Sequence, residues 1–365
     1  MATAQTHKVL LDVMGADHGP EVIIDGGLAA ARKLGDKLQV VLVGQEDIIN
    51  EVLARRQDVP PGVSMLGARS VVPMTISATD GVRMRDSSIS VGLGQIRKGD
   101  GEAFVSPGNT GAVMATALLT LGRIEGVLRP AITSTFPTST GRPLILLDVG
   151  ANVDCKPGHL SQFAVMGAIY SGVMFNLEAP RVGLLSIGEE RSKGNELVFS
   201  ARKLLAGSSI NFAGNIEGRD ILSGTVDVAV TDGFTGNIML KFAESIKPML
   251  FKSIQRQVQT NLFSRLGVGL MLPFLRRLRS QFDYAQAGGA PLLGVDGTVI
   301  ICHGSSSSFA IENAVVAAYE MAAKGIKERI HQELLTNHFG NGNGANKSKD
   351  HRDWVVCAAS ADNKR

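Results

Sequence analysis

The chain has 365 residues, of which 44% are hydrophobic, and a formal net charge of +3. This length suffices for a large buried core in one α/β unit or two closely joined domains. The small charge and the 5% aromatic content argue against a nucleic-acid partner, which calls for basic surface and stacking side chains. The cysteines Cys155, Cys302 and Cys357 lack the paired spacing of a disulfide framework or a zinc site. We therefore expect a protein of the reducing cytosol.

Short apolar runs alternate with helical patterns along most of the chain. The first helices are expected from Glu21 to Leu34 and from Asp47 to Arg56. The expected strands are residues 9–13, 39–43, 103–106, 145–148, 182–187, 210–212, 226–230 and 299–302. Such alternation predicts a mainly parallel sheet covered by helices on both faces. In sheets of this kind, ligands bind beyond the carboxyl ends of the strands.

Three of these strands run directly into a loop rich in Gly, Ser, Thr and Asn that is followed at once by a helical pattern. The loops are residues 107–111, 231–237 and 303–308. A helix N-terminus carries unpaired backbone N–H groups and about half a unit of positive charge, which favours an anion. The same residue types are also ordinary helix N-caps. Together with the strand ends at 148–152 and 188–190, the loops predict one site for an anion such as phosphate.

Residues 245–286 depart from this alternation. Apolar residues recur there at helical spacing, namely Phe251, Ile254, Val258 and Leu262. An apolar segment and the basic run 276–279 follow. The pattern predicts an amphipathic helical hairpin. It could lie on an anionic membrane through residues 251–282, pack in a dimer interface, or do both.

The end of the chain differs again in composition. Residues 336–365 are polar and include a Gly/Asn-rich stretch, which predicts a disordered tail and leaves 7–335 as the α/β domain. No apolar segment before Asp12 has the length of a signal peptide. No run reaches the roughly 18 apolar residues that a membrane-spanning helix needs. We therefore expect a cytoplasmic protein with, at most, peripheral membrane contact.

The common nucleotide and hydrolase motifs are absent from the sequence. It has no Walker loop, no G-x-G-x-x-G after the first strand, no H-E-x-x-H and no G-x-S-x-G. The polar residues near the strand ends are mostly amides, hydroxyls and a few basic groups. Such a set suits binding an anion and stabilising developing negative charge better than redox chemistry. We expect neither a metal nor a cofactor.

Seven motifs, in order along the chain, resemble those of one family. They are residues 11–20 (LDVMGADHGP), 105–112 (VSPGNTGA), 147–157 (LDVGANVDCKP), 187–190 with 193–197 (IGEE, KGNEL), 214–220 (GNIEGRD), 232–237 (DGFTGN) and 288–294 (GGAPLLG). Ordered motifs cover about residues 8 to 330. On this basis the chain is identified as a member of the bacterial phosphate acyltransferases, which make acyl phosphate from acyl-acyl-carrier-protein.

The resemblance implies a homodimeric, cytosolic, membrane-associated enzyme that supplies phospholipid synthesis. It also implies a Rossmann-like α/β/α sandwich, related to phosphate acetyltransferases and isopropylmalate dehydrogenases. In the implied reaction, inorganic phosphate attacks the thioester of acyl carrier protein directly. A phosphotransacetylase that uses acyl-coenzyme A shares this chemistry and is the alternative. A metal-dependent hydroxyacid dehydrogenase and a catalytically silent membrane scaffold are rivals of other classes.

The substrate-binding residues follow from the matched motifs. Phosphate cradling is assigned to Ser106, Asn109, Thr110 and Gly111, and further substrate contacts to Asp12 and Gly236. For Asn109 and Thr110, helix N-capping without any ligand contact remains an open alternative.

The catalytic residues are assigned at four other positions, three of them in the same motifs and the fourth, His303, just after a strand. Lys193 would neutralise phosphate or the tetrahedral intermediate, and Asn152 and Asn237 would donate to the thioester oxygen. His303 would protonate the departing thiolate. The alternatives are a solvated lysine, two turn-forming asparagines and a structural histidine. We interpret Cys155 as inert, because no histidine is evidently paired with it.

Overall fold

The computed structural model describes residues 6–258, 271, 274 and 288–336. Its strands are β1 (His7–Asp12), β2 (Leu38–Gly44), β3 (Val63–Gly67), β4 (Ala103–Ser106), β5 (Ala131–Phe136), β6 (Leu144–Leu147), β7 (Val182–Leu185), β8 (Phe212–Ile216), β9 (Val228–Val230), β10 (Ala290–Leu293) and β11 (Thr298–Ile301). Its helices are α1 (Pro20–Leu34), α2 (Glu46–Ala54), α3 (Ala78–Arg83), α4 (Ser88–Lys98), α5 (Thr110–Thr120), α6 (Pro157–Phe175), α7 (Glu196–Ala206), α8 (Asp220–Ser223), α9 (Gly233–Val258), α11 (Ser308–Ala323) and α12 (Ile326–Thr336). A short 3-10 turn, η1 (Gly35–Lys37), links α1 to β2. The predicted α/β class is confirmed.

The described strands form one sheet in the order β3-β2-β1-β4-β11-β10-β5-β6-β9-β7-β8. The run from β3 to β11 is parallel, and so is the run from β6 to β8. Between them, β10 is antiparallel to β11 and to β5, and β5 is antiparallel to β6. Three successive antiparallel pairings reverse the strand direction, so the two parallel runs point opposite ways. The sheet is therefore mainly parallel, as predicted, but mixed at its centre.

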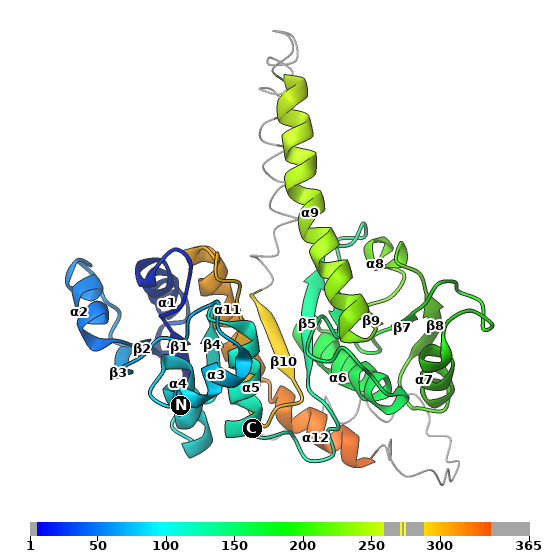
Figure 1. Ribbon diagram of the computed structural model, residues 1–365, viewed down its shortest axis with the longest axis horizontal. Helices are drawn as coiled ribbons and strands as arrows, with labels where there is room; N and C mark the ends of the chain where they lie inside the picture. The colour runs from blue at the N-terminus through cyan, green and yellow to red at the C-terminus, as the bar shows by residue number, and fades with distance from the viewer. Residues whose placement is uncertain (1–5, 259–270, 272–273, 275–287, 337–365) are drawn as a thin grey trace.

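Helices cover both faces of this sheet. Alternate residues of a strand point to opposite faces, and accordingly Val9 and Leu11 belong to one apolar core while Leu10 belongs to the other. The first core includes side chains of α1, α6, α11 and α12, and the second includes side chains of α4, α5 and α8. Figure 1 shows the two halves of the molecule side by side, with β10 and β5 between them. The result is a three-layer α/β/α sandwich.

Most predicted elements match observed ones to within a few residues, but β8 does not. The strand expected at 210–212 begins at Phe212 and continues to Ile216. Gly214, whose φ is +102°, and Asn215 interrupt its apolar pattern, which hides the strand from a periodicity argument. Strands β3, β5 and β10 are additions to the predicted set.

The loop expected at 231–237 is shorter in the structure. The helix α9 already begins at Gly233. The Asp232 carboxylate accepts hydrogen bonds from the Thr235 N–H at 2.8 Å and the Thr235 hydroxyl at 2.9 Å. This capping starts the helix inside the stretch that the residue types suggested was loop.

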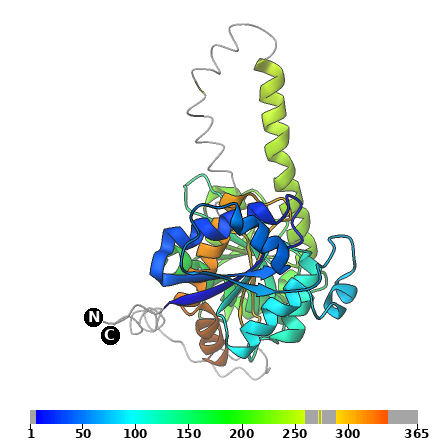
Figure 2. The ribbon, with the colours of Figure 1, turned by 90° about the vertical axis from the view of Figure 1, so that its left-hand side faces the viewer.

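Helix α9 has 26 residues and extends well beyond the rest of the molecule (Figures 1 and 2). It forms the first part of the segment predicted to be a helical hairpin. Between the end of α9 and residue 288, the structure describes only Met271 and Phe274, both helical and exposed. The predicted tail lies outside the described residues, apart from Thr336. Among the described helices, none combines the length and the apolar content required to cross a membrane.

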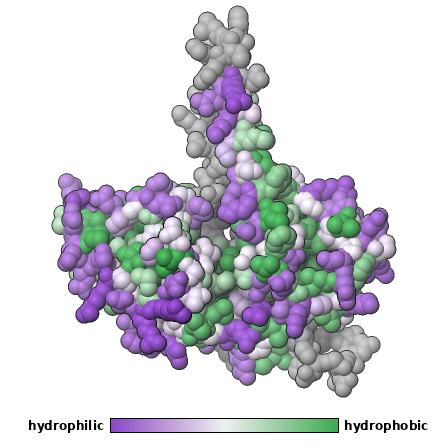
Figure 3. Space-filling model, viewed as in Figure 1, coloured by the Kyte–Doolittle hydropathy of each residue, from purple (hydrophilic) through white to green (hydrophobic). Residues whose placement is uncertain are grey.

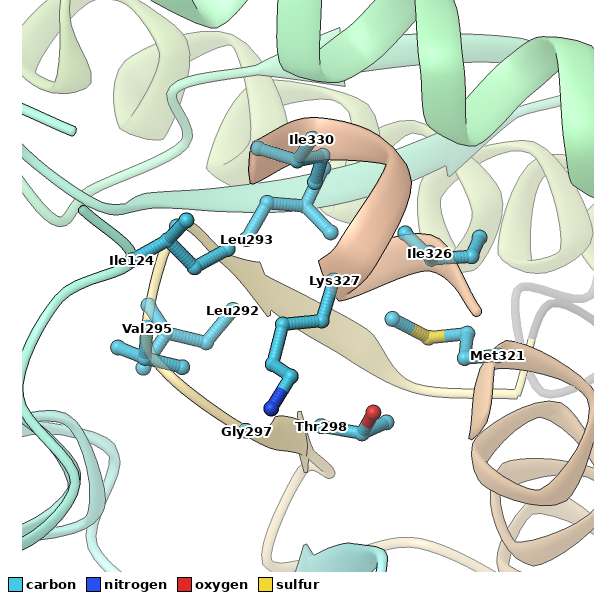
Figure 4. A pocket seen from close by; sticks show the side chains of 11 residues that line it. Ile124, Leu292, Leu293, Val295, Gly297, Thr298, Met321, Ile326, Lys327 and Ile330 are labelled. Carbon is cyan, nitrogen blue, oxygen red and sulfur yellow. The ribbon is translucent and has the colours of Figure 1, made fainter. Parts of the chain in front are cut away.

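A small pocket lies where α12 packs against the turn between β10 and β11 (Figure 4). Its lining is mostly apolar and consists of Ile124, Leu292, Leu293, Gly294, Val295, Gly297, Thr298, Met321, Ile326, Lys327 and Ile330. The Lys327 ammonium lies 3.2 Å from the Asp296 carboxylate beside it. The pocket is at the amino end of β11, whereas the candidate residue His303 follows the carboxyl end. We therefore interpret it as part of the packing of α12.

Two glycines in α4 occupy contrasting environments. Gly92 is buried, and a Cβ atom there would overlap the Phe104 ring, with Cδ2 at 2.8 Å. Phe104 belongs to β4 and is completely buried, so it has little room to move. A Cβ atom at Gly94 would meet no atom within 4 Å. The absence of a side chain is therefore a packing requirement at Gly92 only.

We expect Gly92→Ala to lower the free energy of unfolding by about 1–3 kcal/mol, the usual cost of overpacking a core. Gly94→Ala in the same helix should raise it by about 0.5–1 kcal/mol, because alanine is the better helix former. Urea unfolding followed by circular dichroism measures both. Equal effects of the two substitutions would contradict this account of how α4 packs.

Candidate functional site

All ten candidate residues lie at or just beyond the carboxyl end of a strand. The first group comprises residues that follow β1, β4 and β11, namely Asp12, Ser106, Asn109, Thr110, Gly111 and His303. The second group comprises residues that follow β6, β7 and β9, namely Asn152, Lys193, Gly236 and Asn237. Each group belongs to one of the two parallel runs. Because the runs point opposite ways, strand direction brings residues together within each group but does not by itself join the two groups.

The three loops of the first group contact one another. The Cys302 N–H donates to the Ser106 carbonyl at 2.8 Å, which joins β11 to the end of β4. The Asp17 N–H donates to the Gly304 carbonyl at 2.8 Å, which joins the loop after β1 to the loop after β11. The loops therefore form one continuous surface at the carboxyl edge of this half of the sheet.

Asp12 and Ser106 support this surface from below. The Ser106 hydroxyl donates to the Asp12 carboxylate at 2.6 Å and accepts from the Gly108 N–H at 3.1 Å. The other Asp12 oxygen accepts from the Met14 N–H at 3.0 Å. Burial raises the pKa of Asp12 to about 6, although the hydrogen bonds from Ser106, Ser88 and Met14 lower it. Since both side chains are buried, the structure places them as supports of the loop.

Asn109 is the N-cap of α5. Its side-chain oxygen accepts from the Ala112 N–H at 3.0 Å. Its amide nitrogen donates to the carbonyls of Met74 at 3.0 Å and Ile76 at 3.1 Å. Asn109 therefore ties the segment around Met74 to the start of the helix, and both ends of its side chain are engaged.

Thr110 and Gly111 form the first turn of α5 directly after this cap. The Ala112 and Val113 N–H groups are bonded to the side chain and the carbonyl of Asn109. Within the described residues, no hydrogen bond occupies the Thr110 and Gly111 N–H groups or the Thr110 hydroxyl, and Thr110 is exposed. These groups offer donors to an anion at the positive end of an 11-residue helix.

His303 is exposed on the neighbouring loop. Its Nδ1 atom accepts from the Ser305 N–H at 3.2 Å and lies 2.7 Å from the Ser305 hydroxyl. A backbone N–H can only donate, so Nδ1 carries no proton when the ring is neutral, and the proton is on Nε2. The neutral ring thus presents an Nε2–H donor.

The second group is organised around the buried carboxylate of Asp148, the residue after β6. It accepts from the N–H groups of Ile132, Gly150, Ala151 and Asn152 at 2.7–3.2 Å and from the Asn152 side chain at 2.9 Å. Burial raises the pKa of Asp148, and these hydrogen bonds oppose that effect. The Asn152 side chain also donates to the Pro130 carbonyl at 2.7 Å. Both N–H bonds of that amide are therefore used within the protein.

Gly236 and Asn237 lie in the first turn of α9, against the same carboxylate-bearing segment. A Cβ atom at Gly236 would overlap the Asp148 carbonyl oxygen, so only glycine allows this close approach. Asn237 is exposed, and its side chain has no hydrogen bond within the described residues. Of the two asparagines in this group, Asn237 is thus the one with a donor available to a ligand.

Lys193 lies in the loop between β7 and α7 and is exposed. Its N–H donates to the Glu190 carbonyl at 3.0 Å. Its ammonium forms no ion pair within the described part of the chain. The structure thus leaves this cation available, at the carboxyl end of the strand next to β9.

Two further positions near the candidate residues are Cys155 and Arg83. Burial raises the pKa of the Cys155 thiol to about 12, which suppresses the thiolate form that a nucleophile requires. Arg83 pairs with Asp80 at 3.5 Å on the surface. The residue that sequence reasoning missed is Asp148. An acidic residue directly after a buried apolar strand was the available signal, because such a carboxylate needs several donors around it.

Solved structures with a similar fold include two phosphotransacetylases. The enzyme from Streptococcus pyogenes aligns with a TM-score of 0.59 and 16% identity, over 87% of this chain and 94% of its own. The EutD phosphotransacetylase from Staphylococcus aureus aligns with a TM-score of 0.57 and 16% identity, over 88% and 95% of the two chains. The predicted similarity to the phosphate acetyltransferase fold is confirmed.

Sequence comparisons are more specific. A family described as "Fatty acid synthesis protein" matches residues 7–329. The phosphate acyltransferase of Syntrophotalea carbinolica is 46% identical over 327 residues, which cover 89% of this chain and 93% of that protein. The phosphate acyltransferase of Geotalea uraniireducens is 43% identical over 332 residues, which cover 91% and 95%. The chain therefore belongs to the phosphate acyltransferase family of fatty acid synthesis proteins.

Proposed function

We propose that this phosphate acyltransferase transfers a fatty acyl group from acyl-acyl-carrier-protein to inorganic phosphate and supplies acyl phosphate to phospholipid synthesis. A phosphate oxygen attacks the thioester carbonyl carbon, a tetrahedral intermediate forms, and its collapse breaks the C–S bond. The carrier thiolate leaves and takes up a proton. Phosphate is already a nucleophile at neutral pH, so this route needs no covalent enzyme intermediate. Positioning the two reactants and stabilising the oxyanion remain as the tasks of the protein.

The observation that carries this proposal is the pair of N–H groups at the start of α5 that bond to no described residue. They belong to Thr110 and Gly111, and Asn109 fixes the turn that presents them. The buried Asp12–Ser106 pair holds the preceding loop through the Gly108 N–H. We assign phosphate to this position, where the helix N-terminus favours an anion.

Three exposed donors are assigned to the reacting thioester. The Nε2–H of neutral His303 suits donation to the developing oxyanion, and in its protonated form the ring can supply the thiolate with a proton. Asn237 offers an amide N–H, and Lys193 offers a charge that neutralises phosphate or the intermediate. Asn152 supports Asp148 instead of donating to substrate, because both of its N–H bonds are used internally.

The decisive test is phosphate-dependent release of thiol from a long-chain acyl carrier protein, with acyl-coenzyme A assayed in parallel.

The same assay tests the phosphate-binding position at the start of α5. Thr110→Pro removes one of the two N–H groups assigned to phosphate, and proline fits the first position of a helix. Asn109 has φ −56° and ψ 112°, a conformation compatible with a following proline. Because hydrogen bonds to charged groups contribute about 1.5–3 kcal/mol, the KM for phosphate should rise about tenfold or more.

The control is Thr110→Ala, which keeps the N–H and removes only the hydroxyl. It should change the KM for phosphate less than Thr110→Pro does, while both variants keep the unfolding midpoint of the parent. An unchanged KM for phosphate in a folded Thr110→Pro protein would refute phosphate binding at the start of α5. Turnover with acyl-coenzyme A but not with the carrier would replace the proposed reaction by that of a phosphotransacetylase.

The buried Asp12 gives a second test, through stability. Its pKa is raised from 3.8 to about 6, so the folded state holds this proton more tightly than the unfolded chain does. The group therefore favours folding below about pH 4, and that contribution is lost as the pH rises through about 6. At about 1.36 kcal/mol for each unit of pKa difference, the full titration of Asp12 lowers the free energy of unfolding by about 3 kcal/mol.

Asp12→Asn lacks this titration. The difference in unfolding free energy between parent and variant, measured in urea at pH 4 and pH 7, should shift by about 2 kcal/mol against the parent. Subtracting the variant cancels the other titrating groups. A difference that does not depend on pH would show that Asp12 is ionised alike in both states.

The enzyme is further proposed to be a homodimer. Phe234, Ile238 and Phe242 lie on one face of α9 at intervals of four residues and are 59%, 54% and 68% exposed. Figure 3 shows apolar surface along the lower part of this helix. Burying three such side chains contributes several kcal/mol, at about 1.5–3 kcal/mol each. A second copy of the chain is the occupant that we assign to this face.

Peripheral contact of a cytoplasmic protein with an anionic membrane, through residues 251–282, is proposed as a separate property. Met249, Leu250, Met271 and Phe274 are exposed apolar residues in or near this segment. The basic run 276–279 lies outside the described residues. An apolar surface beside basic residues suits the boundary between lipid headgroups and acyl chains.

The two surfaces can be separated by mutation. Ile238→Ser with Phe242→Ser should convert the dimer to a monomer in sedimentation velocity. Met271→Ser with Phe274→Ser should leave the dimer intact and reduce flotation with vesicles that contain anionic lipid. Leu119→Ser, at a 69% exposed position elsewhere, is the matched control and should change neither. Loss of dimer and vesicle binding together in one variant would mean a single shared surface.

A further inference from the structure

The loop that carries Lys193 is anchored by a side chain from the neighbouring strand. Asn215 is in β8 and only 6% exposed. Its amide nitrogen donates to the Glu190 carbonyl at 3.1 Å and to the Lys193 carbonyl at 3.2 Å. One side chain therefore holds two points of the loop, one of them the backbone of the lysine itself.

The sheet register places Asn215 for this task. Strands β7 and β8 are parallel, with Leu184 opposite Asn215, and they lie next to each other at the end of the sheet (Figure 1). Opposite residues on neighbouring strands point to the same face. Asn215 thus points to the face of Leu184, near the end of the strand from which the Lys193 loop departs.

The side chain of Lys193 is also guided from the other side, by Gly188. A Cβ atom at Gly188 would lie 2.7 Å from both Oε2 of Glu190 and Cγ of Lys193, and 3.2 Å from Cβ of Lys193. The aliphatic stem of the lysine therefore lies across this glycine. A methyl group at position 188 would displace this stem together with the Glu190 carboxylate.

Beyond Lys193 the loop is fixed by the start of α7. Gly194 has a φ of +124°, which favours glycine, and a Cβ atom there would lie 2.7 Å from the Val198 side chain. Asn195 caps α7 by accepting from the Val198 N–H at 3.0 Å. The lysine is thus held between an anchored turn and a helix cap.

We infer that Asn215 and Gly188 are positioning residues for Lys193. The fold itself then sets the orientation of this cation. The inference rests on the proposed role of Lys193 in acyl transfer. A lysine side chain has many rotamers, so a fixed backbone and a guided stem reduce the entropic cost of placing its charge. Since Lys193 has no acidic partner within the described residues, this anchoring takes the place of an ion pair.

The alternative is that Asn215 only stabilises β8, which is the last strand of the described sheet. Asn211 provides a matched control at the other end of the same strand. Its side-chain amide also donates to a backbone carbonyl, that of Ala179 at 2.9 Å. That contact is remote in the chain from the Lys193 loop. Asn211→Ala thus removes a similar hydrogen bond without touching the loop.

The experiment is a double-mutant cycle on kcat/KM for phosphate, with the full-length parent, Asn215→Ala, Lys193→Ala and the double variant. We expect Asn215→Ala to lower kcat/KM about tenfold or more and to have almost no further effect once Lys193 is alanine. Gly188→Ala should act in the same direction as Asn215→Ala, and Asn211→Ala should leave kcat/KM unchanged. Hydrogen exchange of residues 189–195 should accelerate in Asn215→Ala only.

Each contrary result has a distinct meaning. An equal loss from Asn215→Ala with and without Lys193 would overturn the inference, because the asparagine would then act independently of the lysine. Full activity of Lys193→Ala would overturn it at its first step while leaving phosphate acyl transfer intact. Absence of phosphate-dependent turnover in the parent would instead refute the proposed function, and exchange in the 189–195 loop would still report whether Asn215 anchors it.

Discussion

A buried carboxylate at the end of a strand organises the candidate site in each half of the molecule. Asp12 ends β1, and Asp148 follows β6 directly. Each carboxylate collects donors from the loop that follows it: Met14 and Ser106 around Asp12, and a run of backbone N–H groups around Asp148. Removing a charge from water is costly unless hydrogen bonds replace the lost hydration. The loops are therefore held in the conformations that satisfy these acids.

In this arrangement, the residues that hold the loops differ from those that a ligand can contact. The residues that are most deeply buried, Asp12, Ser106 and Asp148, shape the backbone and have no exposed polar atom to offer. Thr110, Asn237 and His303 are exposed and carry donors that the described part of the protein leaves available. Gly236 belongs to the supports as well, because its missing side chain lets α9 approach the Asp148 carbonyl. A rigid frame beneath a few available donors is what electrostatic preorganisation of an oxyanion requires.

Much of this could be predicted from sequence, because apolar runs and their periodicity directly reflect burial. The alternation of strands and helices gave the fold class, and the Gly/Asn loops marked the strand ends where all ten candidates lie. The antiparallel strands β5 and β10 could not be predicted, since strand direction depends on tertiary pairing and not on local pattern. For the same reason the two groups of candidates seemed to share one edge. The commitment of Asn152 to Pro130 and Asp148 is likewise a contact between distant segments that residue type alone cannot reveal.

The length of α9 has a mechanical consequence. At about 1.5 Å per residue, its 26 residues form a rod about 39 Å long. Its first turn contains Gly236 and Asn237, and its other end is far from the sheet. Because Gly236 packs closely against the Asp148 carbonyl, the rod is fixed at the end that lies in the candidate site. A partner bound at the distant end would therefore hold the same continuous helix that presents the Asn237 amide at its start.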